Sequence, residues 1–192
     1  MIDPTRTYTV DDLYELARLP EYADMRLELS EGRLITMSPA SIKHGKHANW
    51  LGYLITRHVD EHDLGEVAAA ETGYILYKNP DPKGKDIVRA PDVSFIATAR
   101  IPIEGLPESG YFNGAPDLAV EVVSPGDDAA EIQTKIEEYL RYGVRMIVIA
   151  YPKPRTIVVH TTAGIKTLKG DEVLDGGAVL PGFAVTVNQI FK

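Results

Sequence analysis

Hydrophobic residues recur at helical spacing in three stretches of the chain. The first stretch is short, because Thr9 and Asp12 form a variant of the capping box and the helix that follows ends near Pro20. The second helix is predicted at about residues 41–62 and the third at about residues 128–142. Helices therefore alternate with other structure along most of the chain.

The segments between these helices predict strands. Residues 26–29 and 33–37 alternate around Ser30, Glu31 and Gly32, which is the pattern of a hairpin. Residues 66–78 are expected to form one extended strand that ends in a proline-containing turn. Further strands are predicted at residues 92–97, 117–123 and 145–150, and the chain after Pro154 is expected to be rich in β-structure.

The order of these elements indicates an α/β (α+β) fold. Strand 117–123, helix 128–142 and strand 145–150 follow one another in the order of a parallel crossover, whereas the hairpins favour antiparallel neighbours. We therefore expect a mixed β-sheet flanked by helices, with additional β-hairpins. The loop at about residues 98–116 is long enough to suggest a function of its own.

Composition narrows the class of protein. The 192 residues fit one domain, expected to cover residues 1–192, and the absence of cysteine excludes disulfides, thiolate zinc sites and cysteine nucleophiles. No stretch approaches the roughly 20 apolar residues that span a bilayer, and residues 1–10 lack the apolar centre of a signal peptide. We expect a cytoplasmic protein without membrane contact.

The net charge of −8 argues against a protein that coats nucleic acid without specificity. A nuclease remains possible, because enzymes that bind metals through carboxylates are acidic at their sites. Five basic residues are candidates to line a groove, namely Lys43, Lys46, Lys83, Lys85 and Arg89. Solvated surface is the more common role for such residues.

Glu121 is the most informative residue, because an ionised carboxylate inside an apolar strand is costly unless a cation or several donors compensate it. Asp92, at the start of a neighbouring predicted strand, is a candidate to share a hard cation with it. Lys135 flanks the apolar stripe of the third helix, so its ammonium is expected to reach the ends of these strands.

Two acids, a lysine and a divalent ion suit phosphodiester hydrolysis, in which the metal polarises the phosphate and generates hydroxide while the lysine stabilises or orients. From spacing alone, a purely structural role for these three residues has about the same weight as a catalytic role. Glu121 would then pair with Lys135 or Arg141 as a buried salt bridge, and Asp92 would serve as a turn or cap residue.

Several segments, in order over about residues 26–152, resemble signatures of the Uma2 (DUF820) family of restriction-endonuclease-like proteins. They are Leu27–Leu29 to Met37–Pro39, Ala90–Val93, Pro116–Pro125, and Lys135 with Tyr139 and Gly143–Val144. The resemblance implies a PD-(D/E)xK core at about residues 26–152. It also implies a Mg²⁺ (or Mn²⁺) cofactor, DNA as substrate and a tendency to form homodimers.

By this resemblance Asp92 is the aspartate of the PD motif and Glu121 is the second acid, and both are metal ligands together with the backbone carbonyl of Val122. Val123 stands where the simplest pattern has lysine, so Lys135 on the following helix is the implied replacement. Glu28 matches a hairpin glutamate of the family and is either an additional catalytic acid or an exposed hairpin charge.

A second departure concerns the strand at 145–150, where the family usually has an acidic, aromatic stretch ending in Asp-Pro. This chain has Met146, Ile147, Val148 and Tyr151–Pro152 instead, which keeps burial and removes polar groups.

Three weaker signals involve histidines, a serine and glycines. His44 is either a phosphate donor or base, or a helix cap or surface imidazole. His58 and His62 have the spacing of a helical metal pair but no third ligand. Ser124 lacks the G-x-S-x-G context of hydrolases, and no phosphate-binding glycine motif follows a predicted strand, so no nucleotide cofactor is expected.

The sequence therefore predicts a metal-dependent endodeoxyribonuclease with an Asp92, Glu121 and Lys135 site. The alternative is a catalytically inactive domain that keeps the nuclease-like core to bind DNA or a protein partner, which the low basicity favours.

Overall fold

The N-terminal part of the chain builds a five-stranded sheet. The computed structural model describes residue 3 and residues 5–192. The sheet has the strand order β2-β1-β5-β4-β7 and is antiparallel except for the β4–β7 pair. Its strands are β1 (Arg26–Ser30), β2 (Arg33–Met37), β4 (Tyr74–Tyr77), β5 (Ile87–Arg89) and β7 (Phe112–Asn113). Helix α1 (Val10–Ala17) packs on this sheet, and Thr9 and Asp12 form the predicted capping box.

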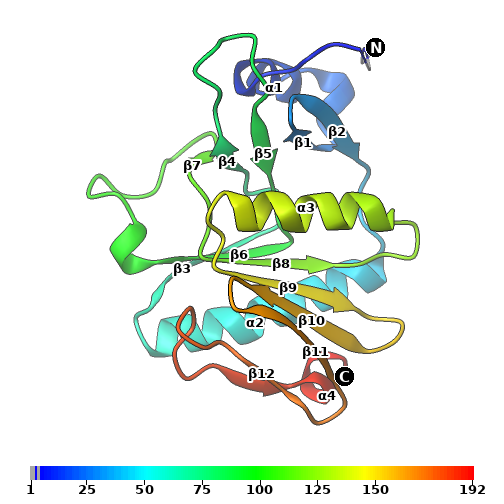
Figure 1. The fold of residues 1–192 in the computed structure, drawn as a ribbon, viewed down its shortest axis with the longest axis vertical. Coiled ribbons are helices and arrows are strands. Elements are labelled where there is room, and N and C mark those ends of the chain that lie inside the picture. The colour runs from blue at the N-terminus through cyan, green and yellow to red at the C-terminus, as the bar shows by residue number, and fades with distance from the viewer. Residues whose placement is uncertain (1–2, 4) are drawn as a thin grey trace.

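A second, six-stranded sheet occupies the middle of the molecule (Figure 1). Its order is β11-β10-β9-β8-β6-β3, and only the β8–β9 pair is parallel. The strands are β3 (Gly65–Ala69), β6 (Val93–Ala97), β8 (Leu118–Val122), β9 (Met146–Tyr151), β10 (Thr156–Thr161) and β11 (Gly164–Lys169). The predicted parallel crossover is confirmed, because α3 (Ala129–Arg141) connects β8 to β9.

The remaining elements lie around these sheets. The long helix α2 (Ile42–Glu61) follows the first hairpin, as predicted. Two short 3-10 helices, at Pro20–Tyr22 and Thr98–Arg100, interrupt the loops. The chain ends with a hairpin of β12 (Val173–Asp175) and β13 (Ala184–Thr186), followed by α4 (Val187–Ile190).

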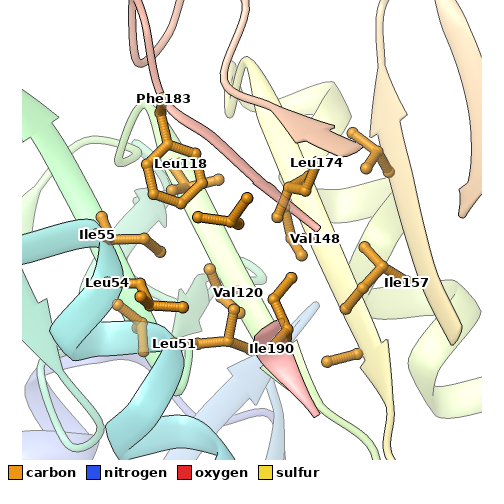
Figure 2. Close-up of a cluster of buried hydrophobic side chains, with 14 of the residues drawn as sticks. Leu51, Leu54, Ile55, Leu118, Val120, Val148, Ile157, Leu174, Phe183 and Ile190 are labelled. Carbon is orange, nitrogen blue, oxygen red and sulfur yellow. The ribbon is translucent and has the colours of Figure 1, made fainter. Parts of the chain in front are cut away.

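The largest core lies between α2, the six-stranded sheet and the C-terminal segment (Figure 2). Alternate residues of β8, Leu118 and Val120, point into this core against Leu51 and Ile55 of α2. The residues that alternate with them, Ala119 and Glu121, must face the opposite side of the sheet, where α3 lies. A carboxylate of a buried strand is thus directed at the helix that carries Lys135.

Alternation has the same consequence on β1. Leu27 and Leu29 pack under α1 in a separate cluster with Val88 of β5. Glu28 therefore points to the other face of the five-stranded sheet, toward α3. The cluster around α3 includes Ile136 and Tyr139 together with residues from both sheets. Helix α3 therefore packs against residues of both sheets.

One sequence-based expectation about strands is wrong. Residues 66–78 do not form one strand, because β3 belongs to the six-stranded sheet and β4 to the five-stranded sheet. The chain turns at residues 70–73, where the Tyr111 ring lies so close that a Cβ on Gly73 would come within 2.2 Å of it. The short strand β5 was also not predicted.

Among the helices of residues 5–192, none combines the length and apolar character that a bilayer crossing requires.

Candidate functional site

The predicted site residues come together at the junction of the two sheets. Lys135 Nζ on α3 lies 2.9 Å from Glu121 Oε1 of β8 and 3.1 Å from Glu28 Oε1 of β1. Glu28 is 1% exposed, so the interpretation of an exposed hairpin charge is wrong. The ammonium of Lys135 therefore bridges carboxylates from both sheets.

Asp92 occupies the segment that leads into β6, and its carboxylate is almost fully buried. Its Oδ2 accepts a hydrogen bond from the backbone N–H of Val122 (2.8 Å) and lies 3.0 Å from His44 Nε2. Its Oδ1 accepts a hydrogen bond from Arg26 Nη1 at 3.0 Å. Asp92 is thus attached to the strand that carries Glu121, and it is not a simple turn or cap residue.

Further buried charged and polar side chains surround the bridge between Glu28, Lys135 and Glu121. Arg89 Nη1 lies 2.9 Å from Glu28 Oε2, and Arg89 Nε lies 2.5 Å from Glu138 Oε2. Ser30 Oγ donates to the other oxygen of Glu138 at 2.7 Å, and Tyr139 donates to Glu121 Oε1 at the same distance. The side chain of every residue in this group is buried, so each charge depends on its neighbours for compensation.

Neighbouring charges shift the acids in opposite directions. Burial raises the pKa of Glu28, but Lys135, Arg89 and Arg26 outweigh it and leave that pKa below its usual value. The pKa of Glu121 stays raised, because burial and the charges of Asp92 and Glu28 prevail over Lys135. Asp92 is opposed by burial, yet the hydrogen bonds from His44 and Val122 and the charge of Arg26 lower its pKa to about 2. Two ionised acids thus surround one that resists ionisation.

The same contacts act on the basic groups. Burial opposes the charge of Lys135, but Glu121 and Glu28 raise its pKa, so the lysine stays protonated at neutral pH. The hydrogen bond to Asp92 raises the pKa of His44 despite partial burial. His44 is therefore not the N-cap of α2, a role that Ser41 fills, and its imidazole belongs to the site.

Except for Ser30 and Glu138, these groups line an open cleft of about 2110 Å³ between the hairpin β1–β2, the N-terminal half of α2 and the start of α3. The lining includes nine aspartate and glutamate residues and four arginine and lysine residues, so the cleft is acidic. Lys43, Lys46, Lys83 and Lys85 do not line it and are solvated surface, whereas Arg89 contributes from the floor.

Whether a divalent cation fits is decided by the carboxylates themselves. Three carboxylates are hard oxygen donors of the kind that Mg²⁺ and Mn²⁺ bind, and burial together with the charges of Asp92 and Glu28 raises the pKa of Glu121, which a bound cation would oppose. In residues 3 and 5–192, however, no group of three or more histidine or acidic side chains is arranged as a metal site. The donor chemistry fits, provided that the cations now paired with Asp92 move away.

Other candidates take structural roles. His58 Nε2 lies 3.0 Å from the carbonyl of Pro181 and His62 Nδ1 lies 2.8 Å from the carbonyl of His58, so neither ring points to a shared ligand. Arg141 lies near Glu31 (3.8 Å) and not Glu121. The alternative in which Glu121 forms a buried pair is confirmed for Lys135, and this pair is compatible with a catalytic role.

Sequence reasoning missed Arg26 and Glu138, and it named Arg89 only as a basic residue that could line a groove and Tyr139 only as part of the family signature. One signal was present, because Lys135, Glu138 and Tyr139 are spaced at i, i+3 and i+4 and so share one face of a helix. Arg26 and Arg89 reach partners 49 to 66 residues away, which no local pattern reveals.

Comparisons with known proteins agree with the fold. A family model described as "Uma2: Putative restriction endonuclease" matches residues 11–188. No curated protein matches the chain in sequence. A solved structure described as a "putative nuclease belonging to DUF820" from Anabaena variabilis superposes with a TM-score of 0.78 at 20% identity, covering 95% of this chain and 97% of the other. The expected mixed α+β fold is therefore confirmed.

Proposed function

The chain belongs to the Uma2 family of restriction-endonuclease-like proteins, and on that premise we propose that it is a metal-dependent endodeoxyribonuclease. The observation that carries this proposal is the bridge that Lys135 forms between Glu28 and Glu121 on the floor of an open cleft, with Asp92 held to the same strand. Acids and a lysine in such proximity suit phosphodiester hydrolysis.

The acids are proposed to hold the metal. Asp92 and Glu121 provide carboxylate oxygens from adjacent strands, and the carbonyl of Val122 adds a third oxygen donor of the kind that Mg²⁺ or Mn²⁺ takes. A bound divalent cation supplies polarisation of the phosphate and a lower pKa for the attacking water. Strands of a buried sheet are rigid supports, which favours a fixed position for these oxygens.

Lys135 is proposed to act on the substrate directly. Its raised pKa keeps the ammonium charged, and a charged group next to the phosphate stabilises the negative charge that develops as water adds to phosphorus and the bond to the leaving oxygen breaks. Glu28 fixes the position of this ammonium from the opposite side, while Arg89 and Glu138 fix Glu28.

DNA as the substrate is supported by the charge of α2. Between Ile42 and Val59 the helix has no acidic residue, and it exposes Lys43, Lys46 and Arg57. Tyr53, half-exposed on the same helix, lines the cleft and offers an aromatic ring for stacking. In a chain of charge −8, these side chains offer a phosphate backbone positive charge beside the cleft.

The test is cleavage of supercoiled plasmid and short duplex DNA with Mg²⁺ or Mn²⁺. Asp92→Asn, Glu121→Gln and Lys135→Met preserve shape and should each reduce nicking at least about 100-fold, the typical size of such contributions. The matched control is Glu131→Gln, an exposed glutamate on the same helix and the same cleft, which should nick like the wild type. Equal nicking by all variants would refute the assignment of the site.

A non-catalytic domain that binds DNA or a protein is the second candidate. The observation in its favour is that each acid of the cluster already has a cation from its own chain, namely Lys135, Arg89 or Arg26. This candidate expects binding to duplex DNA, measured by fluorescence anisotropy, without nicking under any divalent ion. Nicking that is lost in the three variants would eliminate it.

A further inference from the structure

Arg26 occupies a position where its guanidinium faces several acids at once. Its Nη1 lies 3.0 Å from Asp92 Oδ1, and its Nε lies 4.0 Å from Glu28 Oε1. The charges of Glu28, Glu121 and Asp92 all stabilise its protonated form. The guanidinium thus supplies positive charge at the acids proposed to bind a metal.

The other permanent cations of the site are committed elsewhere. Lys135 joins Glu28 to Glu121, and Arg89 joins Glu28 to Glu138. Apart from the titratable His44, Arg26 is the cation that contacts Asp92 within residues 3 and 5–192. Any further cation that binds Asp92 therefore meets Arg26 first.

Arg26 is also the member of the cluster that can leave. Its side chain is 20% exposed, compared with 2% for Arg89, and it opens into the cleft. Its Nη2 rests against Met37 Sδ, on the residue that pairs with it across the hairpin, and this contact is weak. A long, partly exposed side chain exchanges positions at little cost, whereas the buried Arg89 does not.

We propose that Arg26 is a built-in competitor of the divalent cation, occupying Asp92 in the metal-free protein and yielding that carboxylate when the metal binds. This inference rests on the proposed function, because it assumes that Asp92 is a metal ligand. It explains how a buried acid remains ionised without a metal, and it makes the metal affinity of the wild type lower than the proposed oxygen ligands alone would give.

The sign of the effect distinguishes this role from others. If Arg26 only contacted substrate, its removal would leave metal affinity unchanged, and if it held the site together, removal would weaken binding. A competitor predicts tighter binding on removal. The expected gain is about tenfold or more, because tenfold corresponds to about 1.4 kcal/mol and one hydrogen bond to a charged group is worth at least that.

The test is calorimetric titration of Mn²⁺ into the wild type, Arg26→Met and Arg26→Lys. Arg26→Met keeps the aliphatic stem and should bind Mn²⁺ about tenfold more tightly, whereas Arg26→Lys keeps the charge and should remain near the wild type. Arg33→Met is the matched control, because Arg33 lies on the same hairpin and cleft but pairs with Glu131, away from Asp92. Its affinity should not change.

Thermal denaturation with and without Mn²⁺ guards against a variant that folds poorly, because a ligand that binds the folded state raises Tm by an amount that grows with the logarithm of its affinity. Arg26→Met should show the larger Mn²⁺-induced rise in Tm. Equal or weaker Mn²⁺ binding by Arg26→Met, with binding by the wild type abolished in Asp92→Asn, would overturn the competitor role alone. Absence of Mn²⁺ binding in both the wild type and Arg26→Met would overturn it together with the proposed metal site.

Discussion

Removal of the Arg89 guanidinium should lower the free energy of unfolding strongly. It is 2% exposed and pairs with both Glu28 and Glu138, which come from different parts of the chain. Breaking a buried ion pair by removing one partner costs about 3–5 kcal/mol, because the remaining charge is left without compensation. Arg89→Met, which keeps most of the side-chain volume, should therefore destabilise the protein strongly.

Two features reduce the loss, and both can be read from the structure. Glu28 keeps Lys135 as a partner, so mainly Glu138 is left uncompensated, with the hydroxyl of Ser30 still donating to it. Arg89 Nη2 is buried and has no hydrogen-bond partner among the described residues, and its removal recovers part of the roughly 1–3 kcal/mol that such a group costs. The net expectation is a loss of about 2–4 kcal/mol.

The assay is urea denaturation followed by far-ultraviolet circular dichroism, with calorimetry for Tm. For a chain of this size each kcal/mol lowers Tm by about 2–4 °C, so Arg89→Met should unfold roughly 4–16 °C below the wild type. Arg33→Met removes an arginine from an ion pair of similar length, 2.7 Å, whose partners are about half-exposed, and should cost at most about 1 kcal/mol.

A double substitution tests the cause. Glu138→Leu in the Arg89→Met background removes the stranded carboxylate, so the double variant should be more stable than the sum of the two single losses predicts, by about 0.5–3 kcal/mol. If Arg89→Met loses no more stability than Arg33→Met, the buried network is screened like a surface pair and the reasoning fails.

Two further predictions concern positions away from the site. Gly65 has φ +150° and an added Cβ would lie 2.0 Å from the carbonyl of Ile96, so Gly65→Ala should lower the urea midpoint by the equivalent of about 2 kcal/mol, and an unchanged midpoint would contradict this. Burial lowers the pKa of His160 below 6.5, so its folded form resists protonation; stability should be complete above pH 6.5 and be lost as pH falls through the window below it. His160→Gln should lack that part of the pH dependence, as measured by urea midpoints between pH 5 and 8.

Local patterns were sufficient for most elements of the fold. The capping box of Thr9 and Asp12, the first hairpin and the three main helices lie where spacing predicted them, because each depends on residues close in sequence. The error at residues 66–78 has a physical origin. Gly73 lies at the turn between β3 and β4, but a single glycine inside a strand-like run also fits a bulge, and no local pattern shows that the strands on either side of it belong to different sheets.

The residues of the site likewise divide into those that local sequence patterns reveal and those that they do not. Glu121 could be recognised because a carboxylate in an apolar strand is anomalous by itself, and the strand and helix spacings place Lys135 opposite it. Arg89 was recognised as a basic residue that could line a groove, but its buried pairing with two glutamates could not be, since a basic residue in a three-residue strand has no local anomaly. Its burial follows only from Glu28, 61 residues earlier, and Glu138, 49 residues later.

Helix α3 controls the geometry of the whole cluster. The acids of the proposed site stand on two different sheets, with Glu28 on one and Glu121 on the other, so neither sheet alone fixes the distance between them. Lys135, Glu138 and Tyr139 extend from one face of α3 to both sheets, and Tyr139 is fully buried between them. The packing of α3 therefore sets the separation of the carboxylates, and with it the affinity for any cation that they share.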